Sequence, residues 1–234
     1  MDIDVIFDFR SDTPPGKDPD TWSPTLRHYH RLLWSKPLPS GEPFALDDAT
    51  PGAYLHHRSA IGEFWLSSDS VVPTFSRTRR IAHIIEQVPV EDRDVFHAIS
   101  YTIGGMMVFP GNRIDGKMTI NGARGCHHKI KDRFDLTVEC IRRHYSSQSS
   151  PLSDTFERYA DFFRLFGDFP GYVDFFLLQD LVTVDYSAVR FFSPFEDFDP
   201  WPIPGTVTEY IDYRRLATDF IKARNLRILD QQRA

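Results

Sequence analysis

The spacing of apolar residues predicts that most of this 234-residue chain is helical. A first helix is expected after Ser23, whose hydroxyl can cap it, with Pro24 in the first turn. A second is expected over 128–145, where Ile130, Phe134 and Ile141 recur on one face and charged residues occupy the other. Two further helices are expected to start with capping boxes: one over 153–166, at Asp154 and Glu157, and one from Thr206 onward. Another helix is expected over 171–182, and short amphipathic helices are expected over 59–66 and 76–88.

One segment departs from helical spacing. Residues 99–108 are rich in side chains that favour strands, and the FPGN that follows is typical of a turn. Residues 117–120 are the expected partner strand, which gives a hairpin over about 99–120 packed on the helix at about 128–145, because two strands alone are marginally stable. The prediction is therefore an α+β fold: one mainly helical domain over 1–234, with a small β-hairpin and a helical C-terminal half over 153–229.

Composition adds that the core is rich in aromatic residues, since the chain contains 20 Phe and is 41% apolar. A net charge of −6 argues against a polybasic binding protein. The N-terminus lacks the pattern of a secretory signal, and no apolar run is long enough to span a membrane. Cys126 and Cys140 do not form a disulfide framework. A cytoplasmic protein without membrane contact is expected.

Charge is unevenly distributed along the chain. Residues 111–144 contain eight basic and four acidic side chains, so they carry +4 in a chain that is otherwise −10. The same segment holds four glycines, two asparagines and two adjacent histidines, which expose backbone and hydrogen-bonding groups. Such a basic region attracts a negatively charged partner.

The first functional hypothesis is phosphate binding in this basic region. The sequence NGARG (121–125) leads directly into HHKIKDRF, so backbone N–H groups at a helix start are expected to face the same space as the basic side chains. The predicted phosphate ligands are Arg113, Asn121, Arg124, Lys129 and Arg133. The alternative is a solvated helix face with ordinary pairs, Lys131 with Asp135 and Glu139 with Arg143.

A second hypothesis is hydrolysis of a phosphodiester. His57, Asn112 and Asp132 are the candidate catalytic residues, because such cleavage needs a base, a positioning group and charge stabilisation. The cofactor is unknown, although Asp132 and Asp135 together offer oxygen ligands for a divalent metal. Cys126, His127 and His128 do not predict a metal centre, because consecutive side chains diverge. The alternatives are packed or surface histidines and carboxylates paired with neighbouring Lys and Arg.

Long strings of the sequence resemble an uncharacterised bacterial family of unknown function, over about Asp18 to Asn225. They include SPTLRHYHRLLWSKPLPSG, YTIGGMMVFPGNRIDGKMTINGARG and GDFPGYVDFFLLQDLV. The resemblance implies a bacterial cytosolic protein and carries no activity with it.

A shorter string, TIGGMMVFPGN (102–112), is similar to the TIGN-type strand and turn of HNH nuclease domains in modification-dependent restriction enzymes. That similarity would give Asn112 or Asn121 and His57 the roles of the family's asparagine and histidine. The chain departs from the pattern, because Gly105 stands where the asparagine of TIGN is expected and no proline follows His57 in the usual way.

The expected function is that of a nucleic-acid or nucleotide phosphate-binding protein, with bacterial defence or toxin biology as its setting. If the protein is an enzyme, a nuclease or phosphodiester hydrolase is expected. The alternatives are an HNH-like nuclease and a non-catalytic protein-interaction module, in which the aromatic C-terminal half and the region of Trp201 bind a partner. The sequence does not indicate an oligomeric state.

Overall fold

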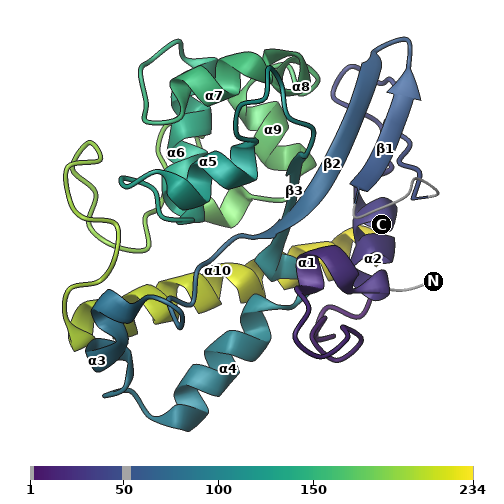
Figure 1. Cartoon of the computed structure of the whole chain (residues 1–234). Helices are drawn as coiled ribbons and strands as arrows, with labels where there is room; N and C mark the ends of the chain where they lie inside the picture. Colours follow the sequence, from purple (N-terminus) through teal and green to yellow (C-terminus); the bar gives the residue numbers. More distant parts are fainter. Residues whose placement is uncertain (1–2, 49–53, 234) are drawn as a thin grey trace.

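The computed structural model describes residues 3–48 and 54–233, in which a small antiparallel sheet lies beside the helices, with the β1–β2 hairpin at the edge (Figure 1). The helices are α1 (Pro19–Trp22), α2 (Pro24–Trp34), α3 (Ala82–Ile85), α4 (Val90–Ser100), α5 (Ile120–Cys126), α6 (Phe134–Tyr145), α7 (Ser153–Arg158), α8 (Ala160–Arg164), α9 (Phe169–Phe175) and α10 (Val207–Arg233). The strands are β1 (Tyr54–Ser59), β2 (Gly62–Ser70) and β3 (Met106–Pro110), and short 3-10 helices are η1 (Arg79–Ile81), η2 (Ile103–Gly105) and η3 (Gln179–Leu181). The predicted mainly helical α+β class is confirmed. No helix within the described residues has the length and apolar character needed to cross a membrane.

The sheet has the order β1-β2-β3, and both strand pairs are antiparallel. β1 and β2 form a hairpin in which Ser59 is opposite Gly62. Gly62 adopts a φ of 137°, which side-chain-bearing residues rarely reach. β3 then pairs with the second half of β2, where Phe109 lies opposite Ser67. The sheet therefore joins two segments that are separated by the helices α3 and α4.

The predicted hairpin over 99–120 is wrong in position. Residues up to Ser100 belong to α4, and the segment proposed as a partner strand leads instead into α5, which Thr119 caps. The chain turns tightly at η2, where a Cβ on Gly105 would lie 2.3 Å from the carbonyl oxygen of Ser100. Only residues after this turn extend as β3, and their partner comes from β2.

The short helix predicted over 59–66 is also wrong, because this segment is the β1–β2 turn and the start of β2. Ile61, Phe64 and Trp65 fall at helical spacing, but Phe64 and Leu66 alternate as a strand requires. A segment this short fits both patterns. Pairing with β1, whose Leu55 faces Leu66 across the hairpin, decides between them.

Helix starts were predicted with mixed success. Ser23 caps α2 as expected, and the capping box at Thr206 and Glu209 opens α10. Asp154 does not cap a helix, since α7 begins at Ser153 after Leu152. The helix expected over 128–145 is α6, which begins only at Phe134. The helix expected over 171–182 is α9, which Asp168 caps and which ends at Phe175. The segment 76–88 contains only η1 and α3.

α10 crosses the molecule, with α5–α9 on one side of it and α3 and α4 on the other (Figure 1). η2 packs closely on this helix, because a Cβ on Gly104 would lie 2.6 Å from the carbonyl oxygen of Ile221. Arg224 and Asn225 fix the contact: Arg224 donates to the Gly104 carbonyl at 3.1 Å, and Asn225 accepts from the Gly104 N–H at 2.7 Å. The start of β3 is thereby anchored to α10.

The core is aromatic, as its composition predicts. Rings from α8, α9 and the segments after them pack edge to face or tilted, for example Tyr172 on Phe176 at 4.8 Å between centroids and Phe166 on Phe176 at 5.0 Å. The segment 191–205 contains no helix or strand. Its Phe192 and Phe198 are buried, whereas Trp201 is exposed.

Candidate anion-binding cleft

Two of the predicted phosphate ligands lie inside the protein. Arg124 is fully buried on α5, where Nη1 donates to the carboxylate of Asp69 and Nε donates to Thr137 at 2.9 Å. Its Nη2 donates to the backbone oxygen of Asp132 at 3.1 Å. Arg133 is also buried, and its guanidinium is paired with Asp135. Neither arginine is available to a ligand from solvent, so both hold the fold together.

The remaining predicted ligands do not gather at one place. Asn121 donates to the Ser67 hydroxyl at 3.2 Å and to the Ser68 carbonyl at 3.3 Å. Lys129 lies 3.9 Å from the carboxylate of Asp199. Arg113 is exposed beyond β3 and forms no ion pair with any described residue.

Of the candidate catalytic residues, His57 is buried and committed to local bonds. Its Nδ1 lies 2.8 Å from the Ala45 carbonyl oxygen and its Nε2 lies 2.7 Å from the Ser59 hydroxyl. The carbonyl of Asn112 accepts a hydrogen bond from Tyr159 at 2.7 Å. Asp132, the third candidate catalytic residue, lines a cleft.

Of the two ion pairs predicted for a solvated helix face, one forms and the other does not. Glu139 pairs with Arg143, as predicted for an i,i+4 pair, and also with Arg142. Asp135 does not pair with Lys131, because Arg133 and the backbone N–H of Phe192 occupy its oxygens. Asp135 therefore cannot share a metal with Asp132, and the described chain shows no group of three or more His, Cys, Asp or Glu side chains arranged to hold a metal ion.

The cleft that Asp132 lines has a volume of about 440 Å³. Its lining comes from the end of β2, the segment 72–78 that follows it, the end of α4, and the loop before α6, with Gly125 of α5 and Ile203 completing it. The polar and aromatic residues that line it are Ser70, Thr74, Phe75, Ser76, Arg77, Thr78, His97, Ser100, Tyr101, Lys131 and Asp132. Gly125, Lys131 and Asp132 come from the basic region singled out in the sequence, so the middle of that region reaches the cleft.

Arg77 and Lys131 are the cationic side chains of the cleft. Neither forms an ion pair or a side-chain hydrogen bond within residues 3–48 and 54–233. They come from segments more than fifty residues apart, and the fold brings them to one surface. The cleft also presents the hydroxyl groups of Ser76 and Thr78, whereas the Ser70 hydroxyl donates to the Val72 carbonyl at 3.1 Å. Two unpaired cations with hydroxyl donors are suited to phosphate oxygens.

Acidic side chains lie behind this surface. Burial raises the pKa of Asp69 to about 7, although the Arg124 guanidinium opposes the shift and the Asp132 carboxylate adds to it. Asp69 directly precedes Ser70, and 24% of its side chain remains exposed. The pKa of Asp20 is also raised well above its ordinary value, first by burial and then by the charge of Asp69. A carboxyl group with a pKa near 7 can exchange protons at neutral pH.

A chain of hydrogen bonds fixes Asp20. Trp34 donates to Nδ1 of His30 at 3.0 Å, which leaves the imidazole proton on Nε2, 3.0 Å from the Ser68 hydroxyl. Ser68 in turn donates to Asp20 at 3.0 Å. Burial lowers the pKa of His30 to about 3, so the ring stays neutral. Each hydrogen bond in the series from Trp34 to Asp20 therefore has a fixed donor and acceptor.

The backbone around the cleft is strained. Phe75, Lys131 and Asp132 line the cleft and have φ values of 58°, 49° and 62°, which side-chain-bearing residues adopt at a cost of about 1–3 kcal/mol each. Such conformations persist only where the surrounding structure enforces them, and they gather at functional sites.

The sequence analysis missed Arg77, Asp69 and His97. A signal for Arg77 was present, since residues 74–80, TFSRTRR, combine hydroxyl and guanidinium groups directly after β2. That run was interpreted as the start of a helix. Asp69 and His97 could not have been found, because their roles depend on segments that meet only in the folded chain.

Comparison with known proteins places the chain in a family but assigns no activity. Residues 3–228 match the model of DUF6994, described as a family of unknown function. No curated protein and no solved structure matches the chain. These findings give no support to the similarity with HNH nuclease domains. Because the family model covers nearly the whole sequence, the chain belongs to the family of unknown function DUF6994.

Proposed function

We propose that this protein binds a phosphorylated ligand, a nucleotide or a nucleic-acid phosphate, in the cleft between β2, α4 and the loop before α6. The supporting observation is that Arg77 and Lys131 line one cleft without carboxylate partners among the described residues. The proposal moves the expected phosphate site away from Arg124 and Arg133, which are buried and bonded to carboxylates inside the protein. It keeps the expected ligand class.

The size and charge of the cleft fit this role. A volume of about 440 Å³ lies within the range of roughly 300–1,000 Å³ that is typical of small-molecule sites. Two cations against the single carboxylate of Asp132 leave the lining positive, in a chain whose net charge is −6. A local positive surface attracts anions and raises their concentration at the cleft, even in a protein whose net charge is negative.

Titration calorimetry with pyrophosphate tests the proposal. Arg77→Ala and Lys131→Ala are each expected to weaken binding about tenfold, as loss of one charge-assisted contact predicts. Arg113→Ala is the matched control, because Arg113 is an exposed basic residue that does not line the cleft. Absence of binding to the unmodified protein, or an equal loss in the control, would contradict the proposal.

A further inference from the structure

We propose that anion binding in the cleft is coupled to the uptake of a proton by the carboxyl pair of Asp20 and Asp69, which lies behind the cleft lining. This inference rests on the proposed function and names how its site is regulated. The coupling makes the protein bind a phosphate group in neutral or mildly acidic solution and release it as the pH rises.

Asp69 and Asp132 share one buried cation, Arg124. Its Nη1 donates to the Asp69 carboxylate, and its Nη2 donates to the backbone oxygen of Asp132 at 3.1 Å. The Asp132 carboxylate lies beside the next residue of α5, because a Cβ on Gly125 would stand 3.2 Å from each of its oxygens. Both acids are therefore held at one place, with Asp132 in the cleft and Asp69 next to the lining residue Ser70.

Asp20 brings a third carboxyl group to this place from α1. It accepts a hydrogen bond from the Ser68 hydroxyl at 3.0 Å, and Ser68 directly precedes Asp69 on β2. Burial and then the charge of Asp69 raise the pKa of Asp20 well above its ordinary value. Two carboxyl groups that interact this strongly titrate as a pair, so Asp20 and Asp69 hold a proton between them.

The charges of the site cancel when every acid is ionised. Three carboxylates and three cations make up the site: Asp20, Asp69, Asp132, Arg77, Arg124 and Lys131. Fully ionised, they leave no net charge to attract an anion. One proton on the pair leaves the site positive by one charge, so the protonated form is the one that binds an anion.

Other titratable groups surround the pair: Asp8, Arg10, Asp18, His30, His97 and Tyr101. Asp18 is exposed, and β3 places the uncharged Met107 opposite Asp69. Burial lowers the pKa of His30 to about 3 and raises the pKa of Tyr101, so both side chains are neutral at neutral pH. Burial also lowers the pKa of His97, which lines the cleft and is neutral under the same conditions.

An anion in the cleft favours the protonated pair. The cleft lies close to both acids, since Ser70 adjoins Asp69, and the charge of Asp20, after burial, raises the pKa of the lining residue Tyr101. A further negative charge nearby raises the pKa of a carboxyl group. Because burial already brings the pKa of Asp69 to about 7, a bound anion extends proton binding to higher pH. By linkage, the affinity for the anion falls as the pH rises and the proton is lost.

Titration calorimetry with sulfate tests the inference. Sulfate is the probe because phosphate groups themselves titrate near neutral pH, whereas sulfate keeps two negative charges there. Measurements at about pH 7.5 in two buffers of different ionisation enthalpy give the number of protons taken up. We expect an uptake of up to about one proton per sulfate, and an association constant that falls by up to about tenfold per pH unit between about pH 7 and pH 8.5.

The double variant Asp20→Asn, Asp69→Asn removes both charges of the pair. Each amide oxygen can still accept the hydrogen bond from Ser68 or Arg124. We expect this variant to bind sulfate with the same affinity throughout the range from about pH 7 to pH 8.5 and to take up no proton.

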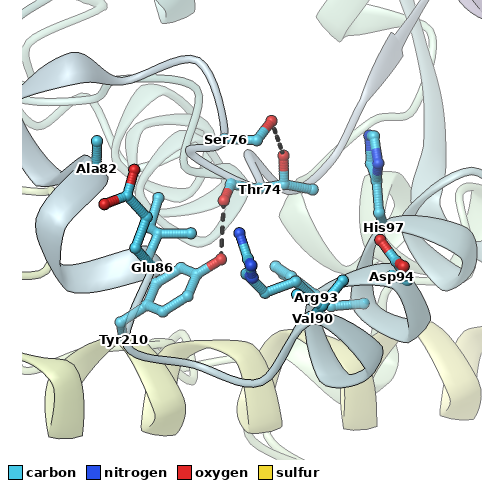
Figure 2. A pocket seen from close by; sticks show the side chains of 11 residues that line it. Thr74, Ser76, Ala82, Glu86, Val90, Arg93, Asp94, His97 and Tyr210 are labelled. Atoms are coloured by element: carbon cyan, nitrogen blue, oxygen red, sulfur yellow. Dashed lines mark hydrogen bonds between the residues drawn. The ribbon is translucent and has the colours of Figure 1, made fainter.

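Asp94→Asn is the matched control. Asp94 lines a smaller hollow, of about 220 Å³, that adjoins the cleft along Thr74, Ser76 and His97. Figure 2 shows Asp94 next to His97 on α4. The Asp94 side chain is exposed, so solvent screens its charge, and its removal should leave proton uptake unchanged. His97→Gln should leave the uptake unchanged as well.

The outcomes separate this inference from the proposed function. Sulfate binding without proton uptake overturns the coupling and leaves phosphate binding standing. Uptake that persists in the double variant, or that disappears in His97→Gln, assigns the proton to another group and overturns the role of the pair. If neither sulfate nor pyrophosphate binds at any pH, both proposals are overturned. If only pyrophosphate binds, equal uptake by the unmodified protein and the double variant overturns the coupling.

The buffer comparison on the unmodified protein does not depend on any variant. Circular dichroism of each variant shows whether a loss of binding reflects unfolding.

Discussion

Arg124 donates a hydrogen bond to Asp69, and the arginine is fully buried while the carboxylate keeps 24% of its surface exposed. The pair joins α5 to β2 directly behind the cleft. The backbone oxygen of Asp132 accepts a further bond from the same guanidinium, so Arg124 also holds the loop that carries Asp132 into the cleft.

Removal of this guanidinium should destabilise the fold strongly. Arg124→Met removes the guanidinium donor from Asp69, Thr137 and the Asp132 carbonyl, so we expect a loss of about 3–5 kcal/mol in the free energy of unfolding. Urea denaturation measures it. Arg113→Met, at an exposed position, should change the same quantity by less than about 0.5 kcal/mol. Similar values for the two variants would show that the buried pair contributes little.

The raised pKa of Asp69 should make stability depend on pH. In the folded protein the pKa is about 7, against an ordinary value of 3.8, so the folded state binds the proton more tightly than the unfolded state does. The stabilising contribution of the bound proton is complete below the ordinary pKa of 3.8 and disappears as the pH rises through the folded-state pKa of about 7.

The comparison to make is the free energy of unfolding of the protein against that of Asp69→Asn, which does not titrate. Between about pH 4 and pH 7 the free energy of unfolding of the unmodified protein should fall relative to that of Asp69→Asn, by up to about 1.4 kcal/mol per pH unit. Above about pH 8 the difference between the two proteins should stay constant. A difference that is constant over this range, or that changes in the opposite direction, contradicts a raised pKa.

Arg224 is a second buried cation, and it has no carboxylate partner in the described structure. It donates to the carbonyl oxygens of Phe176 at 3.0 Å, Gly104 at 3.1 Å and Met106 at 2.6 Å. Arg224→Met should cost about 3 kcal/mol or more, because several buried acceptors lose their donor at once.

Arg224→Lys should recover little of that loss, since a single ammonium group cannot reproduce the fork that reaches carbonyls on two segments. Thermal unfolding followed by circular dichroism compares the three proteins. Full stability in Arg224→Lys would show that the charge matters and the geometry of the guanidinium does not.

Local sequence signals predicted the helices of this fold better than its sheet. The caps of α2 and α10 depend on a few adjacent residues, and both were identified. The pairing of β3 with β2 joins segments some forty residues apart, and nothing local specifies it. The tight turn at Gly105 also makes sense only beside the end of α4.

The candidate site shows the same limit. The basic composition of 111–144 drew attention to Lys131 and Asp132, which do line the cleft. It could not separate them from Arg124 and Arg133, because burial is decided by Asp69 and Asp135 and by the helices packed over them. Arg77 lies outside that segment altogether. Charge along the sequence located one side of the cleft, and only the fold supplied the other.

The central claim is that the cleft between β2, α4 and the loop before α6 accepts a phosphate group. An NMR titration of the ¹⁵N-labelled protein with pyrophosphate tests this claim most directly. We predict saturable shifts of backbone amides in residues 70–78, 97–101 and 125–132, and their loss in the Arg77→Ala, Lys131→Ala double variant. Shifts confined to residues 112–121, or no shifts at millimolar pyrophosphate, would contradict the claim.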